Sequence, residues 1–372
     1  MKNSSVKPPI VKIIIVCLLG IIIGIVYGRT IIPILTAYPL NQDIAQDYIG
    51  ARALIYHDEE LYPILTIAFE KLGIEWHADH RSSHPPTAFL FVLPLTLFDY
   101  PTAEIIWVIA MFIGLVLSAR MFKLAWKNSL IAGVLSLAWP PTIWSLGQLT
   151  PIWLLGLAIA FELRNHAFIS GINIAIASLP KFFAAPALLH FLYRRKWFAF
   201  AGFVMIWLGA ILLLFLLRPD AISTYFSLNV ENSISQINRP DNGALLVIAW
   251  RNLGWIGLLG AGILILLVFW TGLKNDGVLG WACLVWLGVA LLPIAWVYSL
   301  LPLLPWLVWT FVSPKAKPKL FAGIALLLPY LAPVPTYRVI LIGLTILASG
   351  ISFVLASEKP LLSVTRKNLS TM

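Results

Sequence analysis

Two carboxylates early in the chain are the first residues whose spacing suggests chemistry. Asp43 and Asp47 are four residues apart in the segment Asn41–Tyr48. If this segment is helical, both side chains lie on one face of it. Such a carboxylate either takes a proton from a substrate hydroxyl at the membrane–water boundary or belongs to a solvated loop, and the spacing leaves both readings open.

A histidine-rich stretch, His77–His84, ends directly before two prolines. Three histidines and one aspartate within eight residues suit a metal ion, but their spacing fits no standard zinc-finger pattern, so we predict no metal site. Pro85 and Pro86 indicate the start of a helix. His84, beside that start, is then well placed to hydrogen-bond a phosphate or a sugar.

Polar residues also interrupt the apolar runs further along the chain. Gln148 lies in a break that a tight turn between helices would explain equally well. Lys181 lies inside an apolar run, where an unpaired charge is costly. It either extends its amine to the headgroups or holds an anionic lipid phosphate. Asn232 and Ser233 lie in the polar stretch 218–242, which either supplies hydrogen-bond donors to a ligand or is an ordinary hydrophilic loop.

The composition indicates the class of protein to which these residues belong. Of 372 residues, 60% are hydrophobic and 11% are charged, whereas about 25% are charged in a soluble domain. The net charge of +10 sits largely in short clusters between apolar runs, which favours membrane topology over nucleic-acid binding. Cys17 and Cys283 lie in separate apolar runs, so the sequence predicts neither a disulfide framework nor a zinc site.

The apolar runs predict an all-α integral membrane protein, because a crossing needs about 20 apolar residues. The first run reads as an uncleaved helix rather than a signal peptide. The run 86–98 is short enough to be half-inserted, so the number of crossings between residues 86 and 127 stays open. Pro180 offers an alternative in which 167–193 is broken. We expect about 11 to 13 crossings. The candidate runs are 10–27, 86–98, 103–120, 128–144, 149–163, 167–193, 197–217, 254–273, 277–294, 299–312, 319–333 and 337–356.

The Lys and Arg clusters predict the orientation, because cytoplasmic loops carry an excess of them. They place both termini in the cytoplasm and the segments 28–85 and 218–242 outside, within one polytopic domain of residues 1–372. The first of these segments holds half of the 16 acidic residues. Within it, Leu61–Trp76 has helical apolar spacing and predicts an amphipathic helix on the membrane surface.

Several short motifs follow one another between about residues 45 and 300, and this covers most of the chain. They are Asp47-Tyr48, Ala51 and Ala53, Leu61-Tyr62-Pro63, His84-Pro85-Pro86, Gly147-Gln148, Pro180-Lys181, Arg194-Arg195-Lys196-Trp197 and Asn232-Ser233. In this order they resemble glycosyltransferase family 87, the polyprenol-phosphate-mannose-dependent α-mannosyltransferase group within the GT-C class of multi-spanning glycosyltransferases. One departure is clear: the family tends to carry a Trp closely followed by a His in a late external turn, and here Tyr298 follows Trp296.

The resemblance implies a GT-C-type helical bundle and an inverting transferase in a cell membrane, the bacterial inner or plasma membrane. The donor would be a polyprenyl-phosphate-linked mannose or similar hexose or pentose, and the acceptor a lipid or glycan hydroxyl on the extracytoplasmic face. By this analogy Asp47 is the general base, with Asp43 in reserve, and no cofactor is expected. Besides membrane lipids, the partners are this donor and acceptor. The predicted substrate-binding residues are Tyr48, Arg52, Arg81, His84, Gln148, Lys181, Asn232, Ser233 and Tyr298.

The alternative from another class is a transporter or lipid flippase without chemistry. A cation inside the membrane and many Pro and Gly breaks favour it. The absence of a visible inverted repeat, and the concentration of polar residues on one face, argue against it.

Overall fold

The chain forms an all-α protein in a computed structural model that describes residues 42–75, 79–138, 148–240, 242–312, 319–331 and 338–356. Within these ranges there is no β-strand, and the only β-type pairing is an isolated bridge between Ile64 and Arg81. The first predicted span, 10–27, lies outside the described residues.

The helices follow one another with short connections. They begin with α2 (Gln42–Ile55), α3 (Leu65–Glu70), α4 (Pro86–Val92), the 3-10 helix η1 (Leu93–Leu97), α5 (Tyr100–Met121), α6 (Trp126–Ala138), α8 (Thr150–Glu162), α9 (Ala167–Ser178), the 3-10 helix η2 (Phe182–Ala184), α10 (Pro186–Tyr193) and α11 (Trp197–Leu217). They continue with α12 (Ala221–Asn238), α13 (Leu245–Lys274), α14 (Val278–Ala290), the 3-10 helix η3 (Val297–Leu303), α15 (Leu304–Val312), α16 (Lys319–Leu327), the 3-10 helix η4 (Leu328–Leu331) and α17 (Arg338–Leu355).

Among the residues that the structure describes, three helices are long and apolar enough to cross a membrane by length and composition: α5, α11 and α13. Helix α11 matches the predicted run 197–217 in both bounds, because no polar residue interrupts it and a charged residue flanks each end. Helix α13 begins earlier than predicted and contains a kink at Gly254, whose φ of 54° is favourable only for glycine. Shorter apolar helices lie within the predicted runs 86–98, 149–163, 167–193, 277–294, 299–312 and 337–356.

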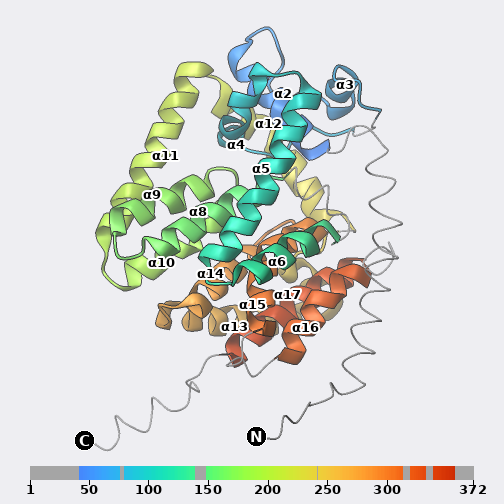
Figure 1. Ribbon diagram of the computed structural model, residues 1–372. Helices are drawn as coiled ribbons and strands as arrows, with labels where there is room; N and C mark the ends of the chain where they lie inside the picture. Colours follow the sequence, from blue (N-terminus) through green and yellow to red (C-terminus); the bar gives the residue numbers. More distant parts are fainter. Residues whose placement is uncertain are drawn as a thin grey trace, which may run out of the picture.

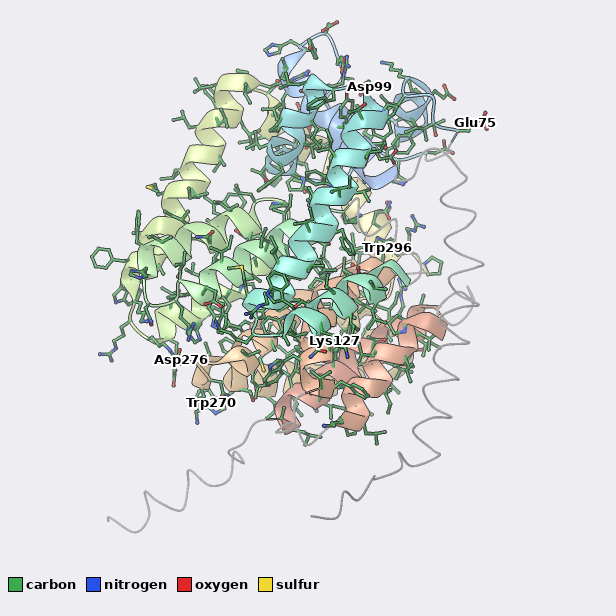
Figure 2. All side chains as sticks on the ribbon, in the orientation of Figure 1. Glu75, Asp99, Lys127, Trp270, Asp276 and Trp296 are labelled. Carbon is green, nitrogen blue, oxygen red and sulfur yellow. The ribbon has the colours of Figure 1, made fainter. Side chains whose placement is uncertain are left out.

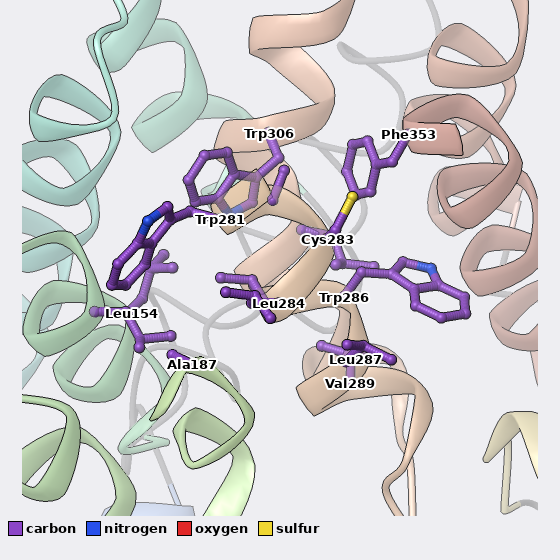
Figure 3. Close-up of a cluster of buried hydrophobic side chains, with 14 of the residues drawn as sticks. Leu154, Ala187, Trp281, Cys283, Leu284, Trp286, Leu287, Val289, Trp306 and Phe353 are labelled. Atoms are coloured by element: carbon purple, nitrogen blue, oxygen red, sulfur yellow. The ribbon is translucent and has the colours of Figure 1, made fainter. Parts of the chain in front are cut away.

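Two hydrophobic clusters build the interior. The larger one surrounds α14, whose residues from Gly280 to Ala290 are all buried. A helix that is apolar all round is expected to be buried, and Figure 3 shows its Trp281 and Trp286 on opposite sides of it, both among neighbouring helices. We call the smaller one the first-loop cluster. It is built from α2, α3, α4 and η1 with the adjoining ends of α5, α11 and α12 (Figure 1).

The run 86–98 belongs to the first-loop cluster and is too short to cross. Its α-helical and 3-10 parts together reach roughly 20 Å, against about 30 Å of hydrocarbon. Ala88, Phe89 and Val92 are buried against α2 and its neighbours instead. The half-inserted alternative therefore fits better than a full crossing, and α5 becomes the next helix that can cross.

The run 167–193 is a hairpin of α9 and α10 broken around Pro180, as one sequence alternative anticipated. Its two ends lie together, because the Lys196 amine donates to the Arg164 carbonyl oxygen at 3.2 Å. Of the two alternatives for this run, the structure has the broken one. Helix α9 ends where the Leu179 N–H donates to the Ala175 carbonyl at 3.0 Å, and Pro180 has no N–H to continue it. Helix η2 then carries the chain back toward the side from which it came.

The other polar segments are also more ordered than predicted. Most of 218–242 was expected as a loop but forms α12, because Ile222, Tyr225 and Leu228 recur every third residue and pack on the first-loop cluster. The amphipathic helix expected over Leu61–Trp76 is only Leu65–Glu70. Its predicted start is extended at Ile64, and Gly73 turns the chain at a φ of 73°.

Asn242 joins two turns that are distant in sequence. Its side chain is fully buried and makes four hydrogen bonds. The amide donates to the carbonyl oxygens of Ile237 at 3.1 Å and Pro293 at 2.9 Å, and the oxygen accepts from the backbone N–H groups of Ala244 and Ala295 at 3.0 Å each. This residue therefore fixes the entry to α13 against the break that follows α14.

Candidate active site

The first-loop cluster contains a buried carboxylate–imidazole pair. Asp47 lies on α2, as the helical reading of Asn41–Tyr48 predicts, and its Oδ1 lies 2.6 Å from Nδ1 of His84. The Asp47 side chain is 0% exposed and the His84 side chain 3%. Oδ2 of Asp47 has no hydrogen-bond partner among the residues that the structure describes. Two residues that the sequence singled out for separate roles thus form one centre.

The backbone of His84 is held from both sides. Its N–H donates to the Ser82 hydroxyl at 3.3 Å, and its carbonyl accepts from the Tyr62 hydroxyl at 3.1 Å. Pro85 then fixes the chain as it enters α4. Because both backbone groups and the ring are engaged, the imidazole has one well-defined position.

Tyr62 links this centre to α12. Its ring is packed between Phe89 of α4, with a centroid distance of 5.5 Å, and Tyr225 of α12, at 5.9 Å. Burial, together with the nearby Tyr225 and Asp47, raises the pKa of Tyr62 well above its usual value. Tyr62 is therefore a neutral hydrogen-bond donor, and its partner on α12 was missed because that segment read as a polar loop.

A second polar pair is formed by Lys181 and Gln148. The Lys181 amine donates to Oε1 of Gln148 at 3.2 Å, and it also lies 5.9 Å from the centre of the Phe183 ring. The hydroxyl of Thr87 on α4 donates to the Leu179 carbonyl at 2.5 Å, two residues before Lys181. The structure thus joins the helix that follows His84 to the break that carries Lys181.

Two predicted phosphate-binding arginines are instead engaged with carboxylates. Arg52 contacts Glu59 at 2.6 Å, and Arg81 contacts Glu60 and the Tyr62 carbonyl. The hydrogen bond to Glu59 is the main reason why the pKa of Arg52 is raised. After α2 the chain folds back and brings Glu59 and Glu60 beside the two cations.

Tyr48 has an internal partner as well. Its hydroxyl donates to the Phe98 carbonyl at 2.7 Å, and its ring packs edge-on against Tyr100. Its side chain is buried, so in this structure it holds α2 against the start of α5. The substrate-binding role of Tyr48 stays a prediction.

The remaining predicted site residues are placed by their backbone only. Asp43 lies on α2, Asn232 and Ser233 on α12, and Tyr298 on η3, but their side chains lie outside what the structure describes. Of the histidine-rich stretch, His77 is likewise not described. Within the described ranges no group of three or more His, Cys, Asp or Glu side chains gathers as a metal site would require.

Arg218 is a structural residue that sequence reasoning missed. From the end of α11 it donates to the carbonyl oxygens of Ala53 at 2.6 Å and Glu59 at 2.9 Å. It therefore ties the end of a long apolar helix to the end of α2, which carries Asp47. Its position directly after an uninterrupted apolar run was the available signal.

The two ends of the bundle differ in charge. Asp99 and Glu75 lie at the end occupied by the first-loop cluster, and Asp276 lies toward the other end (Figure 2). The basic clusters lie together at the second end, where contacts join the ends of α5, α8, α10 and α13. These contacts are Lys123 with Glu162, Lys196 with the Arg164 carbonyl, and Arg194 with Asp276 at 2.8 Å.

Comparison with known proteins gives one match. The sequence profile described as glycosyltransferase family 87 matches residues 83–308, which is more than half of the 372-residue chain. This range contains His84, Gln148 and Lys181, whereas Asp47 precedes it. Neither the curated proteins nor the solved structures gave a match.

Proposed function

The chain belongs to glycosyltransferase family 87, and from this premise we propose that it transfers a sugar from a polyprenyl-phosphate donor to an acceptor hydroxyl with inversion. The sugar is mannose or a similar hexose or pentose, and the acceptor is a lipid or a glycan. An all-α membrane glycosyltransferase can take a donor whose lipid chain stays in the bilayer, so the reacting groups meet at the membrane edge.

The observation that carries this proposal is the buried Asp47–His84 pair, whose segment is hydrogen-bonded through Thr87 to the segment that carries Lys181. Inverting transfer needs a base for the acceptor hydroxyl and a positive group for the departing phosphate. The buried pair at 2.6 Å supplies the first, built on Asp47 with Asp43 in reserve. Lys181, tied to the same helix region through Thr87, supplies the second.

Lys181 is the principal phosphate ligand in this proposal. Arg52 and Arg81 keep the roles of further phosphate contacts, but their charges are already balanced by Glu59 and Glu60. Gln148 orients the Lys181 amine by accepting its hydrogen bond. Tyr48, Asn232, Ser233 and Tyr298 complete the proposed set of substrate contacts.

The charge distribution supports an extracytoplasmic site. Lys and Arg accumulate on cytoplasmic ends, and the basic end of this bundle is opposite the first-loop cluster. With α4 too short to cross and α9–α10 returning as a hairpin, the basic clusters after α5, α8, α10 and α13 all fall on one side. The proposed location is therefore a cell membrane, with the Asp47–His84 pair facing outside.

Transfer by the purified protein tests the proposal. The full chain in lipid nanodiscs is incubated with polyprenyl-phosphate mannose labelled in the sugar and with a membrane lipid extract as acceptor. We expect labelled product and free polyprenyl phosphate in equal amounts, with the anomeric configuration inverted. A protein that moves labelled lipid across vesicles but forms no product is a flippase, and that result contradicts the proposed function.

A further inference from the structure

The two members of the buried pair differ in their access to a substrate. Asp47 has no exposed side-chain surface and its Oδ2 is buried, whereas part of the His84 side chain, 3%, reaches the surface. A base must come within hydrogen-bond reach of the proton that it removes. Both side chains are buried, but of the two only His84 keeps any exposed surface, so it is the member of the pair on the side from which an acceptor hydroxyl would come.

The hydrogen bond between the two fixes which ring nitrogen is basic. An ionised carboxylate only accepts hydrogen bonds, so Nδ1 of His84 carries a hydrogen and donates it to Oδ1 of Asp47. In the neutral imidazole Nε2 then holds a lone pair. Nε2 is separated from Nδ1 by one ring carbon, and its lone pair points away from the carboxylate.

The surroundings hold the imidazole in this orientation. The Ser82 hydroxyl and the Tyr62 hydroxyl bond the backbone of His84 on either side of its Cα. Tyr62 is in turn packed between Phe89 and Tyr225. A ring fixed in this way loses little freedom when a hydroxyl approaches it, which is what a catalytic base requires.

From this geometry we propose that Nε2 of His84 takes the proton from the acceptor hydroxyl and that Asp47 acts through it as a positioning residue. This inference rests on the proposed function and refines how Asp47 acts in it. Asp47 holds the tautomer and stabilises the imidazolium that forms. The role differs from donor-phosphate binding, which the sequence had suggested for His84.

The proposed step is balanced. The O–H bond of the acceptor breaks, its proton passes to Nε2, and its oxygen forms a bond to the anomeric carbon of the donor. The bond from that carbon to the phosphate oxygen breaks, and the electron pair leaves with polyprenyl phosphate, whose charge meets Lys181. The imidazolium then gives its proton to water and returns to the neutral form.

Substitutions at the two residues test the assignment. His84→Asn keeps an N–H near the position of Nδ1 but has no basic nitrogen, and we expect it to lower kcat by at least about 100-fold with KM for the donor nearly unchanged. His84→Ala should be equally slow and should regain transfer when imidazole is added. His80→Ala, which removes a half-buried histidine of the same segment, is the matched control and should remain active.

The pH profile gives a second readout. In the wild type, kcat should rise with pH, because only a neutral imidazole takes up a proton. This rise should be missing in His84→Asn and changed in Asp47→Asn. Near-normal transfer by His84→Asn overturns the assignment, as does a raised KM for the donor in His84→Ala without rescue by imidazole.

The same assay separates this inference from the proposed function. If the wild type forms no product, the proposed function fails and this step fails with it. If the wild type and both His84 variants all form product at similar rates, the transferase function stands and the assignment of His84 is wrong. Thermal unfolding of each variant shows whether a slow variant is still folded.

Discussion

The hydroxyl of Thr87 on α4 donates to the carbonyl oxygen of Leu179, 2.5 Å away and 92 residues later in the chain. Both ends of this bond are buried or nearly so. Thr87 lies three residues after His84, and Leu179 two residues before Lys181. A single side chain therefore joins the segment that carries His84 to the segment that carries Lys181.

Replacing Thr87 with valine should loosen this connection while keeping the shape of the side chain. The Leu179 carbonyl would lose a partner in a buried place, which costs about 1–3 kcal/mol of unfolding free energy. We expect a lower thermal midpoint and a raised KM for the donor. Thr96→Val is the control, because Thr96 bonds the Leu93 carbonyl within its own turn; equal effects of the two would show that Thr87 has no special role.

Asp47→Asn should abolish most of the transfer activity. The change keeps size and shape but removes the charge that the pair needs, so we expect a loss of at least about 100-fold in kcat. Initial rates of sugar transfer measure it, with thermal unfolding as the check on folding. Asp43→Asn should keep most of the activity; the opposite pattern would move the centre four residues toward the N-terminus.

Lys181→Met should weaken binding of the donor and leave proton transfer unchanged. Methionine keeps the apolar stem and removes the charge, and a hydrogen bond to a charged group is worth about 1.5–3 kcal/mol. We therefore expect the donor KM to rise roughly 10- to 100-fold. Lys71→Met, which removes an exposed lysine beside α3, is the control. An unchanged donor KM in Lys181→Met would exclude the phosphate role.

The orientation of the bundle predicts which cysteines an impermeant reagent can label. Ser227 on α12 is exposed on the proposed outer side, and Asn165 is exposed between α8 and α9 at the basic end. In sealed cells Ser227→Cys should react with a membrane-impermeant maleimide, and Asn165→Cys should react only after lysis. The native Cys283 is buried and should contribute little. The reverse labelling pattern would invert the topology.

Stability in acid should depend on Asp276 at the basic end. Burial opposes its ionisation, but Arg194 and His190 outweigh this and lower the pKa of Asp276 below the usual 3.8. A lowered folded-state pKa adds stability above the unfolded pKa, and this is lost as the pH falls through the folded value. Asp276→Asn should thus lower the thermal midpoint at pH 6, and the difference should shrink below about pH 4. A difference that does not change with pH would contradict this.

The long apolar helices were the most predictable part of the fold. Residues 197–217 form α11 with the predicted bounds, because length and uniform hydropathy alone decide such a helix. The runs 86–98 and 167–193 were harder, since their apolar residues pack against protein and not only against lipid. Hydropathy does not distinguish packing against protein from packing against lipid. The short length of 86–98 did indicate a half-inserted segment, and Pro180 did indicate a broken helix in 167–193.

The site could be predicted as a set of residues but not as a set of pairs. Asp47, His84, Gln148 and Lys181 were all named from the sequence, yet which of them touch depends on how α2, α4 and the hairpin pack. The pairing of Arg52 with Glu59 was missed for the same reason. These contacts depend on tertiary folding, which one sequence without its relatives does not contain.

The four hydrogen bonds of Asn242 have a consequence for exchanging parts between relatives. The Asn242 side chain hydrogen-bonds both to the turn before α13 and to the break after α14, so the conformations of these two segments depend on each other. A chimaera that takes residues 237–245 from another enzyme must therefore take the segment around 293–296 from the same source. Recombination points placed between α12 and α14 would separate these halves, whereas a point within 218–220 leaves them together.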